Sequence, residues 1–299
     1  MTGRPHLVIL QSLFYLAYIM AASVCRRAPA IFVNHGAGPL PILRPVTDPD
    51  HGTARTFLEQ TAPQWLGLHG HDTKPSAIVL VTAHWESSTV AISSGASHKL
   101  LFDYSGFPAE AYALTYNAPG SPAIARQIHD LLNAQNIPSK LDAAREWDHG
   151  VFVPMKLIHP AADIPIVQVS VVRGSDPDLH FRIGEALAPL RDQNIAIVGS
   201  GMSYHSFHGQ GNIFQKSKVF SDALVEACGI PDVAGRGAAL KAWESMPNAR
   251  DCHPREEHLM PLHVVAGAGG AGALTSTDFV SSMFAPIHLV AMGWDVVKK

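Results

Sequence analysis

Four histidines stand at the ends of predicted secondary-structure elements in this 299-residue chain. They are His35, His84, His205 and His258. A catalytic divalent metal needs a few neutral imidazoles or carboxylates that converge from rigid elements and leave positions open for substrate. His35, His84 and His258, with the adjacent Glu257, fit that description. One histidine at a strand end is more often a hydrogen-bonded structural residue, but three such ends together favour a metal site.

The remaining candidate residues could bind substrate or move protons. His205 follows a strand in the segment GSGMSYHSFHG, whose glycines allow a tight turn, so its ring can serve as a ligand, an acid or a base. His149 opens a predicted helix in the segment REWDHGVFVP, where we expect Asp148 to cap the helix while the imidazole faces the pocket. Tyr116 is either a substrate contact or a packed aromatic residue.

The elements that carry these residues alternate between strands and helices. Apolar runs predict strands at 30–34, 77–83, 89–93, 164–172, 195–198 and 287–292. Helices are predicted at 53–66, from 121 onward, and at 151–158, 177–191, 214–227, 234–244 and 251–266. The last of these begins near Pro254 and carries His258. This order predicts an α/β fold, a single domain with a central sheet flanked by helices.

Composition narrows the classes of function. The chain is 47% hydrophobic, which provides a large core, and it shows no linker that would divide it. Its net charge is -3 and no cluster of Lys and Arg is present, so nucleic acid is not an expected partner. The three cysteines are too widely spaced for a disulfide framework or a CxxC zinc site. The sequence GAGGAGA at 267–273 lacks the strand-before, helix-after context of a dinucleotide site.

Residues 1–26 differ from the rest of the chain. Residues 7–24 are mostly apolar, and Arg26 and Arg27 follow them. Such a segment is interpreted as a signal peptide, a marginal membrane anchor, a transit peptide or an upstream extension. Residues 27–299 are therefore the predicted catalytic domain, expected in the cytoplasm unless the first 26 residues target it to a secretory or organellar compartment. A membrane is a partner only if those residues form an anchor.

Seven motifs resemble, in their order and approximate spacing, the class III (LigB-type) extradiol ring-cleavage dioxygenases. The most similar branch contains the DOPA 4,5-dioxygenases. The motifs are NHGAGPLPIL, VTAHWES, FDYSGFPAEAY, YNAPGSPAIA, WDHGVFVPMKLIHPAADIPIVQVSV, GSGMSYH and HPREEHLMPL. The resemblance covers about residues 28–295. It implies a non-haem Fe(II) enzyme that inserts both atoms of O2 into a catechol and opens the ring to a muconic semialdehyde-type product.

The resemblance also implies a metal site in which His35, His84 and His258 are the ligands. Glu257 is a reserve ligand, because a related branch uses a glutamate in the third position. His205 matches the acid/base histidine of the family, which approaches the metal in some members and is a second reserve. His149 matches a histidine that lies behind the ligands or binds substrate.

The expected partners are a small-molecule catechol and O2, and Zn(II) is an alternative ion in purified protein. Ser206 departs from the asparagine that commonly follows the catalytic histidine in the family. Two other functions compete with this reading. A zinc hydrolase would use the same histidines to activate water, and a non-catalytic binding protein with this fold would be expected to have lost ligands that this sequence keeps.

Overall fold

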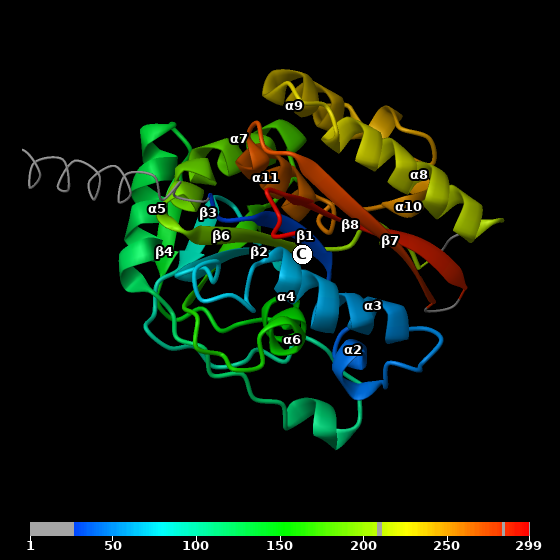
Figure 1. The fold of residues 1–299 in the computed structure, drawn as a ribbon, viewed down its shortest axis with the longest axis horizontal. Coiled ribbons are helices and arrows are strands. Elements are labelled where there is room, and N and C mark those ends of the chain that lie inside the picture. The colour runs from blue at the N-terminus through cyan, green and yellow to red at the C-terminus, as the bar shows by residue number, and fades with distance from the viewer. Residues whose placement is uncertain (1–26, 208–210, 283–284, 299) are drawn as a thin grey trace, which may run out of the picture.

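The computed structural model describes residues 27–207, 211–282 and 285–298 (Figure 1). An eight-stranded mixed sheet runs through its centre in the order β4-β3-β5-β2-β6-β1-β8-β7. The strands are β1 Ala30–Asn34, β2 Ala77–Ser87, β3 Val90–Ser93, β4 Ser139–Asp142, β5 Ile166–Val172, β6 Ile195–Gly201, β7 Leu274–Ser282 and β8 Pro286–Trp294. The four neighbours β5, β2, β6 and β1 are parallel, whereas β8 and β7 pair antiparallel at one edge. The predicted single α/β domain with a central sheet is confirmed.

Helices cover both faces of the sheet (Figure 1). On one side lie α5 Pro122–Ala134, α7 Pro177–Leu187, α8 Ile213–Cys228, α9 Val233–Lys241, α10 Ala249–Cys252 and α11 Met260–Gly269. On the other lie α2 Leu40–Leu43, α3 Gly52–Thr56, a π turn η1 Phe57–Thr61, α4 Ala62–Trp65 and α6 His149–Ile158. Short 3-10 turns are η2 Ala109–Tyr112, η3 Ala188–Gln193 and η4 Trp243–Ser245.

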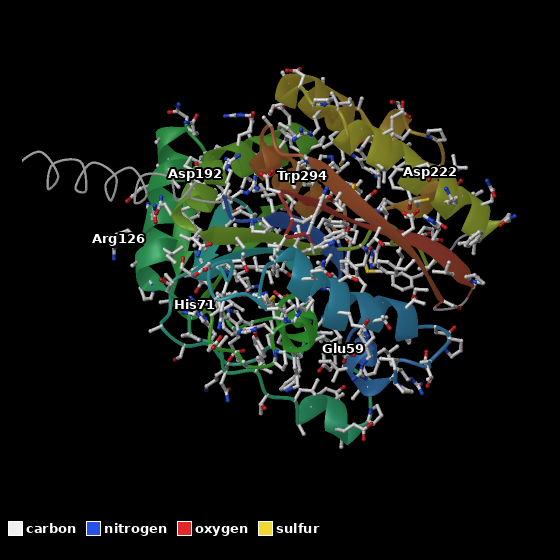
Figure 2. The ribbon with its side chains drawn as sticks, viewed as in Figure 1. Glu59, His71, Arg126, Asp192, Asp222 and Trp294 are labelled. Atoms are coloured by element: carbon white, nitrogen blue, oxygen red, sulfur yellow. The ribbon has the colours of Figure 1, made fainter. Side chains whose placement is uncertain are left out.

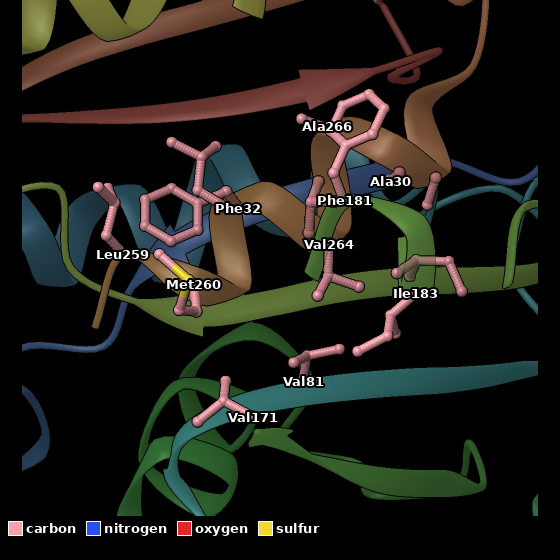
Figure 3. Close-up of a cluster of buried hydrophobic side chains, with 14 of the residues drawn as sticks. Ala30, Phe32, Val81, Val171, Phe181, Ile183, Leu259, Met260, Val264 and Ala266 are labelled. Carbon is pink, nitrogen blue, oxygen red and sulfur yellow. The ribbon is translucent and has the colours of Figure 1, made fainter. Parts of the chain in front are cut away.

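The central strands are buried on both faces, which explains why they read as continuous apolar runs. Successive residues of a strand point to opposite faces, so Phe32 of β1 joins the core under α7 and α11 while Ile31 and Val33 join the core against α4 and α6. Figure 3 shows Phe32 beside Leu259 and Met260, at the start of α11. Exposed charged residues such as Arg126 and Asp222 project outward, whereas Trp294 is enclosed (Figure 2). The packing therefore fixes the register of the strands whose ends carry the site.

Several predicted elements differ from those observed. The helix predicted at 251–266 is helical only at its two ends, in α10 and α11, because residues 253–259 form a loop between them and α11 begins only at Met260. The first residues of the predicted loop 267–273 belong to that helix instead. The sequence also missed the edge strands β4 and β7. Strand β2 runs four residues beyond its predicted end, so His84 lies within the strand rather than after it.

Residues 1–26, with Cys25 among them, lie outside the described residues. The signal, anchor, transit and extension roles of that segment stay predictions. Among the described residues, no helix is long and apolar enough to cross a membrane. Cys228 and Cys252 are buried free thiols.

Candidate metal centre

His35 follows β1 directly and is 1% exposed. Its backbone N–H donates to the carbonyl of Gly201, which holds the residue against the end of β6. Its Nδ1 lies 3.0 Å from Ser200 Oγ. The Ser200 hydroxyl donates its only proton to the carbonyl of Gly150, so Ser200 accepts the hydrogen bond from His35 Nδ1. The neutral ring therefore carries no proton on Nε2.

His84 lies at an irregularity in β2. The pairing of β2 with β6 ends at Thr82, and its register with β5 shifts between Thr82 and Glu86. At this irregularity His84 leaves the regular hydrogen-bonded pairing of β2, beside the carboxyl end of β6. Its Nδ1 lies 3.4 Å from Asp103 Oδ2, and its Nε2 lies 3.1 Å from His35 Nε2.

His258 is held by the loop before α11 and not by a helix. Its carbonyl accepts a hydrogen bond from Met202 N at 3.0 Å. The approach requires glycine at position 201, since a Cβ there would lie 2.1 Å from the His258 carbonyl oxygen. Its Nδ1 lies 2.9 Å from Glu257 Oε1, and its Nε2 lies 3.2 Å from His84 Nε2.

The Nε2 atom of His84 lies 3.1 Å from that of His35 and 3.2 Å from that of His258, which is the spacing of ligands around one ion. Two imidazoles that bind a metal at about 2.1 Å in cis positions have their nitrogens about 3.0 to 3.4 Å apart. Each Nδ1 faces an oxygen acceptor, so the Nε2 lone pair of His84 faces those of His35 and His258, an arrangement that a cation stabilises. The donor set therefore fits a divalent metal that accepts imidazole ligands.

The protonation of the cluster supports the same reading. Burial, followed by the neighbouring imidazoles, holds the pKa of His35 and of His258 well below the usual range. Burial, with His149 beside it, lowers the pKa of His84 to about 3. Neutral imidazoles are the form that binds metal, so protons compete weakly at neutral pH.

Glu257, the reserve ligand, lies on the Nδ1 side of His258. Its Oε1 accepts from that ring, and its Oε2 lies 3.5 Å from Arg255 Nε. Arg255 in turn donates to Glu86 at the end of β2. Glu257 therefore orients His258 in this arrangement. Ligand atoms of His205, Glu257 and His258 nevertheless lie within 4.8 Å of one another, so Glu257 and His205 stay in reserve as ligands.

His205 is stacked on His258. The ring centroids are 3.5 Å apart and the planes differ by 13°. The backbone N–H of His205 donates to the Cys252 carbonyl, and its Nδ1 lies 3.7 Å from Glu257 Oε1. Burial, with a smaller contribution from Arg255, lowers the pKa of His205 to about 4. A neutral imidazole at this place can accept a proton from a group bound at the metal centre.

His149, the first residue of α6, is also brought into the cluster. Its ring centroid lies 3.9 Å from that of His84. Asp148 precedes it at the N-cap position, but the prediction that the Asp148 side chain caps the helix is wrong. Its buried carboxylate instead accepts from Thr82, Arg145 and Gln168, which ties α6 to β2 and β5.

The structure does not bring Tyr116 into this group. It is a core residue whose hydroxyl donates to the His159 carbonyl and whose ring lies near Trp147. The aromatic neighbour of His149 is instead Tyr104, at 5.8 Å between ring centroids. Sequence reasoning also missed Asp103, beside Tyr104. The signal for both residues lies in the FDYSGFP motif.

Comparisons with known proteins show which proteins this chain resembles. The family model described as "Catalytic LigB subunit of aromatic ring-opening dioxygenase" matches residues 30–292. Dioxygenase tasH of Hapsidospora irregularis is 42% identical over 257 residues, which is 81% of this chain and 78% of that protein. The 4,5-DOPA dioxygenase extradiol of Beta vulgaris is 35% identical over 231 residues, covering 74% of this chain and 85% of that one.

A solved structure is similar as well. The crystal structure of uncharacterized protein JW3007 from Escherichia coli K12 superposes with a TM-score of 0.67 at 25% sequence identity. The match covers 89% of this chain and 99% of that one. The segments that carry the histidines, from His35 to His258, lie within the residues that the family model matches.

Proposed function

Because this chain belongs to the LigB family of aromatic ring-opening dioxygenases, we propose that it opens a catechol ring beside the two hydroxyl groups with non-haem Fe(II). Both atoms of O2 would enter the product, a muconic semialdehyde-type compound, so the reaction needs no further oxidant or reductant. The partners would be a small catechol and O2. The observation that carries the proposal is the convergence of three neutral imidazoles beside two further histidines, His149 and His205.

The choice of iron rests on the chemistry that the reaction requires. Three imidazoles accept several divalent metals, zinc among them. Zinc has no redox chemistry, whereas a ferrous ion would hold catechol and O2 together and provide the electron transfer that O2 needs. His35, His84 and His258 would bind that ion through Nε2.

His205 would act on the protons of the substrate. Burial lowers its pKa to about 4, so the ring is neutral at physiological pH. Its Nε2 would be the atom that accepts a proton from a catechol hydroxyl. The same Nε2–H could return that proton as the ring opens. Stacking on His258 keeps the ring beside the ligands, and the Cys252 carbonyl holds its backbone.

Aromatic side chains would hold the substrate ring. Tyr104 lies edge-on to His149, and Phe207 lies edge-on to His205 at 5.0 Å between centroids. Burial raises the pKa of Tyr104 to about 12, and its hydroxyl donates to the Ala111 carbonyl. The phenol is therefore neutral and anchored, and its ring is available for apolar contact with an aromatic substrate.

The test is anaerobic loading with Fe(II), followed by a panel of catechols and oxygen. The panel includes DOPA, because several relatives are named 4,5-DOPA dioxygenases. We expect one O2 consumed per catechol and a yellow ring-opened product. Protein loaded with Zn(II) is the control and should consume none. Iron-loaded protein that binds one ion but consumes no O2 with any catechol would contradict the proposal.

A further inference from the structure

Asp103 occupies a position between a predicted ligand and a predicted substrate-binding residue. It lies in the loop that follows Leu101, whose backbone N–H donates to the Trp147 carbonyl at 2.7 Å. Its Oδ1 accepts from both the backbone N and the Nδ1 of His149, at 3.1 and 2.8 Å. Its Oδ2 lies 3.4 Å from His84 Nδ1. One carboxylate therefore faces an imidazole nitrogen with each of its oxygens.

We propose that Asp103 is a positioning residue that orients His84 and His149 at once. By accepting from Nδ1 of each ring, it keeps Nε2 of each ring unprotonated. His84 then directs a lone pair to the metal, and His149 directs one to the bound catechol. The inference rests on the metal centre of the proposed function.

A second carboxylate in the site also lies between the Nδ1 atoms of two histidines. Glu257 lies between the ligand His258 and the stacked His205, with Oε1 at 2.9 Å from one Nδ1 and 3.7 Å from the other. Each carboxylate therefore joins one ligand to one histidine that would face the substrate.

Only a carboxylate can satisfy both rings. Asparagine at position 103 would keep its carbonyl on the His149 side, because two N–H groups of that residue donate to the same oxygen. Its amide NH2 would then face His84 Nδ1, donor against donor. The His84 proton would move to Nε2, the atom that binds the metal. Alanine would leave both rings free to pair with water.

The contacts of Asp103 predict an unusual order of effects on metal binding. We expect Asp103→Asn to weaken Zn(II) and Fe(II) binding by about 10- to 100-fold, the usual loss when the partner of a ligand is altered, and Asp103→Ala to weaken it less. Dissociation constants are measured by competition with a chelator, and thermal unfolding of the metal-free proteins checks their folding. Asp163→Asn is the matched control, because Asp163 also accepts from a histidine, His159, outside the site.

Catechol binding should show the opposite order. Asparagine keeps an acceptor for His149, so anaerobic titration of metal-saturated protein should give wild-type affinity for Asp103→Asn and weaker affinity for Asp103→Ala. A purely structural role would make the larger truncation worse in both assays. If the Asp103→Asn protein binds metal as tightly as wild type, or no more weakly than the Asp103→Ala protein, the inference is overturned. If alanine prevents folding, the comparison of asparagine with wild type decides. The metal assay needs no turnover, so it judges Asp103 even if no catechol is cleaved.

Discussion

At the scale of single residues, one neighbour on Nδ1 decides what each imidazole can do. Ser200 fills this role for His35, Asp103 for His84 and Glu257 for His258. These partners come from a strand, a loop and the residue adjacent to the ligand. The metal-binding form of each ring is therefore a property of the folded protein, and no single motif encodes it.

The ligand role of His84 predicts a loss of metal without a loss of fold. In His84→Ala, two imidazoles remain, and the bound ion should be lost, whereas far-UV circular dichroism should stay native because the side chain lies at the strand irregularity and not in the apolar core. Metal content of the purified protein is the measurement, with the exposed His71→Ala as control. A stoichiometric ion in the His84 variant would reject the site.

His205 should behave differently from the ligands. His205→Gln keeps three imidazoles, so it should keep Fe(II) and bind catechol, while kcat falls by about 10²- to 10⁴-fold, the usual effect of losing a positioned proton-transfer group. Iron content and kcat are measured in one preparation. Loss of iron as complete as in His84→Ala would make His205 a ligand, and full turnover would remove it from the mechanism.

At the scale of elements, the loop 253–259 is the part of the site that depends most on close backbone packing. Gly201→Ala would place a Cβ 2.1 Å from the His258 carbonyl oxygen. We expect the free energy of unfolding to fall by about 1 to 3 kcal/mol, as for other overpacked sites, and metal affinity to fall as His258 is displaced.

Gly229→Ala is the control for that variant, because the corresponding Cβ would lie 3.1 Å from its nearest neighbour at the end of α8, a much milder approach far from the histidines. Denaturant unfolding gives the free energies, and chelator competition gives the affinities. Wild-type metal affinity in Gly201→Ala would show that the loop can move without disturbing His258.

The elements also show which features the sequence could reveal. Strands buried on both faces, such as β1 and β6, were predictable because they are apolar throughout. The edge strand β7 is mostly polar and mostly exposed or partly exposed, so no apolar run marks it and the sequence did not predict it. Carboxylates at 256–257 resembled a helix start, but Glu256 pairs with Arg250 and Glu257 with His258. The four histidines were thus predictable, whereas their partners depended on tertiary contacts.

At the scale of the whole molecule, the strand order brings distant residues together. Strands β2, β6 and β1 are neighbours in the sheet, so their carboxyl ends place His84, Ser200 and His35 at one edge. The core that covers these strands also encloses histidines outside the site. Burial lowers the pKa of His180 to about 4 and that of His253 to about 3. The fold therefore holds several imidazoles in their neutral form.

This predicts that the metal-free protein loses stability in mild acid. In the unfolded chain these imidazoles titrate near pH 6.5, so between about pH 6.5 and pH 4 the unfolded state binds protons that the folded state does not, and stability falls as pH falls. At pH 5 each such group costs about 2 kcal/mol. Denaturant unfolding between pH 7 and pH 5 measures the loss.

His253→Leu removes one buried imidazole that packs near Phe220 and Trp243. It should therefore reduce the loss of stability by about 2 kcal/mol, whereas the exposed His71→Ala should leave the loss unchanged. A stability that is constant from pH 7 to pH 5, or an equal loss in His253→Leu, would contradict this account, since neutral burial of these rings requires the dependence.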